Sequence, residues 1–186
     1  MSTKLNIPII IGTSRPSRMS EKVAKFVKSV ADKNVEIETT LVDPKDFNLP
    51  EDGGARNYSD PKYVELIKNA DALLIIVPEY NHSFPGSLKR LLDSEKDGYK
   101  NKAVAFAGVS VGPWGGVRAI EQLALSVRWL GLHSITNDVH FPDVNNLFDD
   151  KDEIKDREVQ EKRVNETLTE LIWMAKTLKW GRENVK

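Results

Sequence analysis

The stretch that most constrains the fold is an uninterrupted apolar run, Ala72-Leu73-Leu74-Ile75-Ile76-Val77, which leads without a gap into a proline-bounded loop, Pro78–Lys89. A strand that is buried on both faces has such a run, whereas a strand with one wet face alternates. In sheets built from such strands, ligands bind beyond the carboxyl ends of the strands. Two prolines fix the backbone of this loop before a ligand arrives. The run therefore predicts a central strand of an α/β sheet, followed by a loop that can hold a flat ligand.

Short apolar runs rich in β-branched residues alternate with helical patterns along the whole chain, which is typical of a parallel sheet with helices on both faces. Right-handed crossovers and the number of runs favour a flavodoxin-like three-layer sandwich, with a five-stranded parallel sheet in the order 2-1-3-4-5. The predicted strands are Leu5–Ile11, Val35–Val42, Ala72–Val77, Lys102–Ala107 and Ile135–Phe141. The predicted helices are Glu21–Lys33, Pro61–Asn69, Ser87–Leu92, Gly116–Leu130 and Asp156–Leu178. Two connections are long for such a fold, Pro44–Asp60 and Pro142–Lys155.

Composition narrows the class of protein. With 186 residues and a net charge of −1, the chain is expected to form one domain over residues 1–186. A pI near 6.3 argues against a nucleic-acid partner. No apolar run approaches the length of a membrane span, and Met1–Leu5 leaves no room for a signal peptide, so we expect a cytoplasmic protein without a membrane partner. The absence of cysteine excludes thiolate chemistry, and the three histidines lack metal-ligand spacing, so no metal site is expected.

A polar loop follows the first predicted strand, at Gly12–Ser20. It combines four hydroxyl side chains with two arginines and precedes a helix N-terminus, where backbone N–H groups and the helix dipole favour an anion. The hydroxyls belong to Thr13, Ser14, Ser17 and Ser20, and the guanidinium groups to Arg15 and Arg18. The loop matches neither G-x-x-x-x-G-K-[ST] nor G-x-G-x-x-G. The pattern predicts a site for a single phosphate rather than for a nucleoside triphosphate with magnesium.

A glycine-rich loop, Gly108–Gly116, follows the fourth predicted strand. Glycines let the backbone approach a ligand closely, and Ser110 can hydrogen-bond to it. The same residues, Gly108-Val109-Ser110-Val111-Gly112, also match the G-x-S-x-G elbow of serine hydrolases, with Asp138 and His140 later in the chain. Against that alternative, Pro113–Gly116 delays the next helix, and Asp138 and His140 stand two residues apart on one strand.

In these motifs the chain resembles the NAD(P)H-dependent FMN reductase family, which includes flavodoxin-like quinone, azo-dye and chromate reductases. The matching pieces are Gly12-Thr13-Ser14-Arg15, then Pro78-Glu79-Tyr80-Asn81 with Phe84-Pro85-Gly86-Ser87-Leu88-Lys89, and the loop that ends in Gly115-Gly116. The resemblance implies a bound FMN, with NADPH or NADH as co-substrate. The cofactor-binding residues that it implies are Thr13, Ser14, Arg15, Arg18, Met19, Ser20, Pro78, Glu79, Tyr80, Asn81, Ser110, Gly112, Trp114, Gly115 and Gly116.

Within this set, which of Arg18, Met19 and Ser20 contacts the phosphate stays open. Trp114 could equally stack on a ring or pack at an interface. The resemblance also implies ping-pong hydride transfer through flavin N5 to a small-molecule acceptor such as a quinone, free flavin or azo dye, with no catalytic side chain. It further implies a homodimer or homotetramer. The alternative within the same fold is a flavodoxin-type electron carrier without NAD(P)H activity, although such carriers are usually acidic and lack arginines in the phosphate loop.

Overall fold

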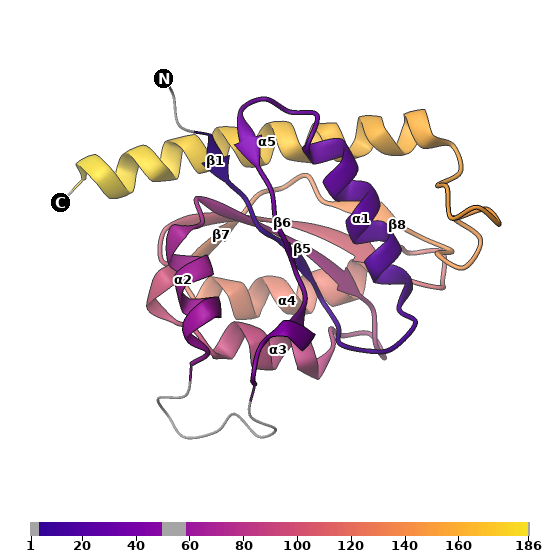
Figure 1. The fold of residues 1–186 in the computed structure, drawn as a ribbon, viewed down its shortest axis with the longest axis horizontal. Helices are drawn as coiled ribbons and strands as arrows, with labels where there is room; N and C mark the ends of the chain where they lie inside the picture. Colours follow the sequence, from indigo (N-terminus) through magenta and orange to yellow (C-terminus); the bar gives the residue numbers. More distant parts are fainter. Residues whose placement is uncertain (1–3, 50–58, 186) are drawn as a thin grey trace.

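The computed structural model describes residues 4–49 and 59–185. They form a central parallel sheet between two layers of helices (Figure 1). The helices α1 (Met19–Ala31) and α5 (Arg157–Asn184) cover one face, and α2 (Pro61–Asn69), α3 (Gly86–Asp93) and α4 (Val117–Trp129) cover the other. Two short 3-10 helices, η1 (Pro44–Asp46) and η2 (Asp97–Tyr99), lie in connections. The part of the long connection that covers residues 50–58 lies outside the described residues.

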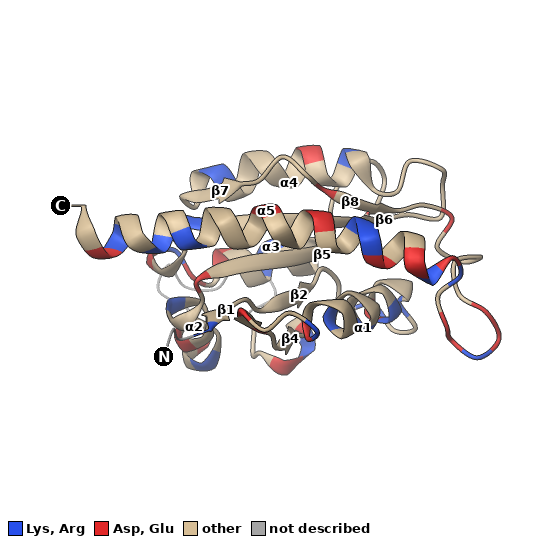
Figure 2. Cartoon of the chain, turned by 90° about the horizontal axis from the view of Figure 1, so that it is seen from above, with Lys and Arg blue, Asp and Glu red and all other residues tan. Residues whose placement is uncertain are grey.

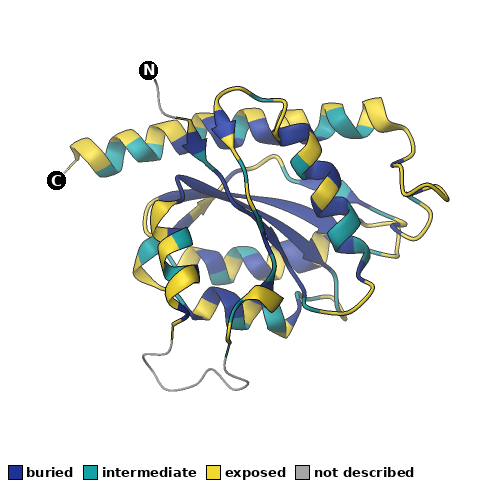
Figure 3. Ribbon diagram, in the orientation of Figure 1, coloured by how far each residue is buried: buried dark blue, intermediate teal, exposed yellow. Residues whose placement is uncertain are grey.

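The two central strands carry the side chains that join the layers. In β5 (Ala72–Pro78) every residue is buried, because successive side chains point to opposite faces and both faces are covered. Leu74 and Ile76 pack against the α1 and α5 layer, while Leu73 and Ile75 pack against the other helices. The dark strands between lighter helices in Figure 3 show the result, and Figure 2 shows β5 without charged residues between helices that carry them.

The sheet has the predicted order once its broken strands are joined. The strands β1 (Leu5–Asn6) and β2 (Ile9–Ile11) form the first line, and β3 (Ile37–Glu38) and β4 (Leu41–Val42) form the second. After β5 come β6 (Lys102–Val109) and the last line, β7 (Leu132–Ser134) with β8 (Val139–Phe141). All pairings are parallel. The order β4-β2-β5-β6-β7 corresponds to 2-1-3-4-5.

The predicted continuity of three strands was wrong, and the hydrogen bonds of two of them show why. Pro8 has no N–H to donate, so the first strand breaks there, although its carbonyl still accepts from Leu74 N at 3.1 Å. In the last strand, the N–H groups of Thr136 and Asn137 donate instead to the carboxylate of Glu170 in α5, each at 3.0 Å. These bonds explain the break within the predicted strand Ile135–Phe141, and the observed line also begins earlier, at Leu132.

The predicted helices all form, with ends shifted by a few residues. The largest change is α5, which continues to Asn184 rather than ending at Leu178. None of the helices in residues 4–49 and 59–185 has the length and apolar character that crossing a bilayer requires.

Candidate FMN-binding site

Three loops meet at the carboxyl edge of the sheet and enclose a cavity of about 500 Å³. They are the Thr13–Ser20 turn after β2, the Pro78–Asn81 turn after β5 and the Val109–Val111 segment at the end of β6. Parallel strands place these loops side by side, because their carboxyl ends share one edge. The residues that line the cavity are Thr13, Arg15, Ser17, Arg18, Met19, Ser20, Pro78, Glu79, Tyr80, Asn81, Val109, Ser110, Val111, Val144 and Asn145.

The first loop is held by hydrogen bonds that use its own side chains. Thr13 Oγ1 accepts from Arg15 N and lies 3.2 Å from the Tyr80 hydroxyl, so it joins the loop to the β5 turn. Ser14 donates its N–H to Ser87 Oγ in α3 at 3.2 Å. Arg15 and Ser17 remain exposed beside the cavity. The first N–H groups of α1 have no partner within the helix, and such groups next to an arginine favour an anion.

Arg18 differs from Arg15 in its surroundings. Its side chain is 3% exposed, and its guanidinium group donates to the Thr13 carbonyl at 2.7 Å and pairs with the carboxylates of Asp43 and Glu21. Burial raises the pKa of Asp43, but the hydrogen bonds from Arg18 and from Lys45 N outweigh this effect, so the pKa is lowered from its ordinary value. The carboxylates of Asp43 and Glu21 therefore neutralise the charge of Arg18, and its hydrogen bond to the Thr13 carbonyl stabilises the loop.

The second loop is a tight turn with a fixed backbone. Tyr80 and Ser83 exchange both backbone hydrogen bonds, at 2.8 and 2.9 Å, and Asn81 and His82 adopt positive φ angles of 49° and 63°. Glu79 N donates to Val109 O at 2.9 Å, which ties this turn to the end of β6. The wall that a flat ligand would meet is thus rigid before binding.

Glu79 is tied to the helix behind the cavity. Its side chain is 11% exposed, and one carboxylate oxygen accepts from Arg118 Nη1 at 3.2 Å. The other oxygen is buried and has no hydrogen-bond partner among the residues that the structure describes. An ion pair to α4 accounts for this residue without a catalytic role.

The third loop positions Ser110 and brings in a segment that the sequence did not suggest. Ser110 Oγ donates to Gly112 O at 2.8 Å, and Val144 N donates to Ser110 O at 3.0 Å. The second bond places Val144 and Asn145 in the cavity lining. Their only sequence signal was the unusual length of the Pro142–Lys155 connection, and Val109 and Val111 were likewise missed.

Some residues that the sequence nominated lie outside the cavity lining. Gly115 and Gly116 have φ angles of 59° and 83°, and a Cβ atom on Gly116 would lie 2.6 Å from Val109 N, so these glycines allow the loop to pack against β6. Trp114 is 62% exposed. Ser14 and Gly112 also fall outside the lining, and their roles as ligands of a cofactor stay predictions.

Ser110 shows no sign of a hydrolase triad. His140 Nδ1 lies 3.2 Å from the Gly115 carbonyl, and in the part of the chain that the structure describes no hydrogen bond joins it to Ser110 or Asp138. Burial raises the pKa of Asp138 to about 6, although a hydrogen bond from the Phe106 backbone opposes this shift. Within the described ranges, no three His, Asp or Glu side chains gather in a way that could hold a metal ion.

One further feature of the cavity suits a phosphorylated ligand. Within residues 4–49 and 59–185, the buried side-chain atoms without a hydrogen-bond partner include Arg18 Nε, Ser20 Oγ and Glu79 Oε2, which all belong to residues of the lining. Buried polar atoms are normally paired. Unpaired donors at the first loop suit a phosphate, whose oxygens are acceptors. The fold and this cavity are those of an α/β protein with a nucleotide-sized cavity at the carboxyl edge of its sheet.

Comparison with known proteins gives the family. The model of the family described as NADPH-dependent FMN reductase matches residues 5–146. The chain is 25% identical over 164 residues to a quinone reductase of Pseudomonas putida, which covers 84% of this chain and 88% of the relative. It is 29% identical over 140 residues to an NADPH azoreductase of a Bacillus species, covering 73% and 75%.

Among solved structures, the flavoenzyme FerB, an NAD(P)H:acceptor oxidoreductase of Paracoccus denitrificans, superposes with a TM-score of 0.73 at 21% identity, over 92% of this chain and 98% of that one. At this identity the likeness concerns the fold. The chain belongs to the NADPH-dependent FMN reductase family and is an oxidoreductase that uses FMN and NAD(P)H.

Proposed function

We propose that this protein binds FMN in the cavity between the three loops and reduces quinones and similar small acceptors with NAD(P)H. The observation that carries the proposal is the coincidence of a preformed cavity of 500 Å³ with unpaired donors at its phosphate end. Arg15, Ser20 and the N-terminus of α1 would hold the phosphate. Tyr80, Asn81 and Ser110 would bound the ring.

The side chains and backbone of the cavity act by positioning FMN and its substrates. When bound, FMN supplies a centre that takes a hydride from NAD(P)H and gives electrons to an acceptor. The Tyr80–Ser83 turn keeps its backbone fixed, and the Glu79 to Val109 bond holds the distance between the second and third loops. Two substrates that use one opening in turn give ping-pong kinetics, which appear as parallel lines in double-reciprocal plots.

The proposal is tested on purified protein. We expect FMN to bind in stoichiometric amount and its absorption to bleach under anaerobic NADPH, followed by recovery when a benzoquinone is added. A protein that binds FMN but stays oxidised with both NADPH and NADH would be an electron carrier instead. A protein that takes up no FMN would contradict the site itself.

The proposal extends to assembly and location, which the family does not decide. We expect a homodimer or homotetramer, tested by light scattering, and a cytoplasmic location, tested by cell fractionation. A single domain over residues 1–186 is also expected, and one unfolding transition with coincident fluorescence and circular-dichroism signals tests it.

A further inference from the structure

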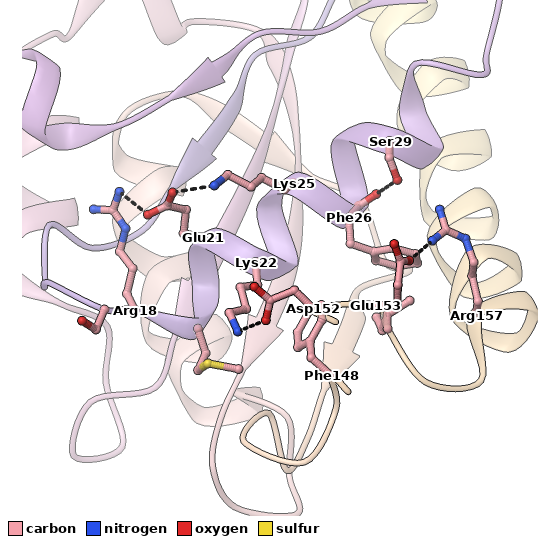
Figure 4. Close-up of a pocket in the computed structure, with 13 residues that line it drawn as sticks. Arg18, Glu21, Lys22, Lys25, Phe26, Ser29, Phe148, Asp152, Glu153 and Arg157 are labelled. Atoms are coloured by element: carbon pink, nitrogen blue, oxygen red, sulfur yellow. Dashed lines mark hydrogen bonds and ion pairs between the residues drawn. The ribbon is translucent and has the colours of Figure 1, made fainter. Parts of the chain in front are cut away.

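A second cavity, of about 610 Å³, lies between α1 and the segment that leads into α5 (Figure 4). Ser17, Arg18 and Met19 line both cavities, so the two adjoin along this turn. The far wall is formed by residues from Phe148 to Arg157. This wall follows residue 146, where the match to the family ends. The far wall of the second cavity is therefore built from residues that the family match does not cover, whereas the α1 side lies within it.

The floor of this cavity is apolar and aromatic. Phe26, Phe148 and Ile154 line it and are almost completely buried. Phe148 and Ile154 face each other across a small hairpin through an isolated antiparallel bridge. A volume of this size and an aromatic floor suit a flat heteroaromatic group such as a nucleobase.

The rim of the cavity carries cations that project from two elements. Lys22 and Lys25 come from α1, and Arg157 comes from the start of α5 (Figure 4). Lys22 lies over the Phe148 ring at 5.9 Å from its centroid, and Arg157 lies over the Phe26 ring at 5.8 Å. The cationic groups therefore stand directly beside the aromatic floor.

These cations are paired in the structure, but with exposed carboxylates. Lys22 pairs with Asp152, whose side chain is 67% exposed, and Lys25 pairs with Glu21 at 2.9 Å. Arg157 is the exception, because it pairs with Glu161 at 2.8 Å, whose side chain is only 23% exposed, as well as with Glu153 at 2.9 Å. Exposed ion pairs contribute about 0–1 kcal/mol each. A phosphate monoester carries nearly two charges and makes stronger charge-assisted hydrogen bonds, so it can displace these carboxylates.

We propose that this cavity binds the adenosine end of NADPH, with the 2′-phosphate at Lys22 and Lys25 and the base against the Phe148 side of the floor. The inference rests on the proposed function, because the nicotinamide end must then reach the adjoining cavity past Ser17 and Met19. NADH lacks the 2′-phosphate, so it would contact only the apolar floor of the cavity. The cavity therefore selects NADPH over NADH.

The test compares Lys22→Met and Lys25→Met with the matched control Lys28→Met. Lys28 also lies on α1 and pairs with Asp32 at 2.6 Å, but it does not line the cavity. We expect kcat/KM for NADPH to fall about tenfold in each cavity variant, through KM rather than kcat, since one charge-assisted hydrogen bond is lost. We expect kcat/KM for NADH to stay within about twofold of the parent value, and the control to leave both values unchanged. An equal fall for both nucleotides, or no change for NADPH, would overturn the assignment.

A binding measurement separates this inference from the proposed function. Adenosine 2′-monophosphate, adenosine 5′-monophosphate and inorganic phosphate are titrated into the FMN-loaded protein by calorimetry. We expect the 2′-monophosphate to bind most tightly and to weaken about tenfold in Lys22→Met but not in Lys28→Met. Equal affinity for inorganic phosphate would show a simple anion site and contradict the adenosine assignment. Because this titration needs no turnover, a protein that binds adenosine 2′-monophosphate without reducing acceptors would refute the proposed function alone.

Discussion

Arg15 and Arg18 lie in the same loop and carry the same charge, but their surroundings predict opposite consequences for the variants Arg15→Met and Arg18→Met. The Arg18 side chain is 3% exposed and pairs with Asp43, whose side chain is 21% exposed. Removing one partner of a buried pair costs about 3–5 kcal/mol, and the partial exposure of Asp43 argues for the lower end. For a chain of this size, about 3 kcal/mol lowers Tm by roughly 6–12 °C.

Arg15 is exposed and forms no ion pair in the part of the chain that the structure describes, so its loss should change the stability by less than about 0.5 kcal/mol. If it binds the FMN phosphate, its loss removes a charged hydrogen bond of about 1.5–3 kcal/mol, which weakens FMN binding roughly 10- to 150-fold.

The assays are urea unfolding of the FMN-free protein, which avoids stabilisation by ligand, and titration of FMN by its fluorescence. The double variant Arg18→Met with Asp43→Asn serves as the control, because removing both charges should restore part of the stability that Arg18→Met loses. An Arg18→Met protein as stable as the parent would refute the stabilising role of Arg18. Unchanged FMN affinity in Arg15→Met would remove this residue from the phosphate site.

Other outcomes follow from single contacts. Because the pKa of Asp43 is lowered, its contribution to stability is present above about pH 4 and is lost as the pH falls through the pKa of the folded state. The difference in the free energy of unfolding between the parent and Asp43→Asn, measured in urea, should therefore narrow from pH 7 to pH 3. A constant difference would contradict this. A Cβ on Gly12 would lie 2.3 Å from Ile76 O, so Gly12→Ala should cost about 1–3 kcal/mol and weaken FMN binding; parent-like unfolding and titration curves would argue against this crowding. Arg118→Met leaves the Glu79 carboxylate without its cation and should lower the FMN content of the purified protein, whereas adding Glu79→Gln should restore it; no restoration would exclude charge as the cause.

Much of the fold could be predicted because its determinants are local in the sequence. The run from Ala72 to Val77 is apolar at every position, which only a strand covered on both faces accommodates, and it was found within a residue of its observed end. The apolar spacing in Met19–Ala31 and the proline at the start of Pro61–Asn69 likewise marked helices. The broken last strand was missed, because Glu170 lies far along the chain from the N–H groups that it binds.

The loops of the candidate site could be predicted from the sequence, but the different roles of Arg15 and Arg18 could not. The sequence by itself determined which loops follow which strands, because parallel strands carry their loops to one edge. It also placed arginines and hydroxyl groups at the phosphate end.

Only the tertiary structure decided that Arg18 turns back to Asp43 while Arg15 stays exposed, since the two residues look alike in the sequence motif. It also brought Asn145 into the first cavity and set Arg157 beside Lys22 and Lys25 around the second. Charge pairing and cavity walls depend on residues that are distant along the chain, and packing alone fixes how they meet.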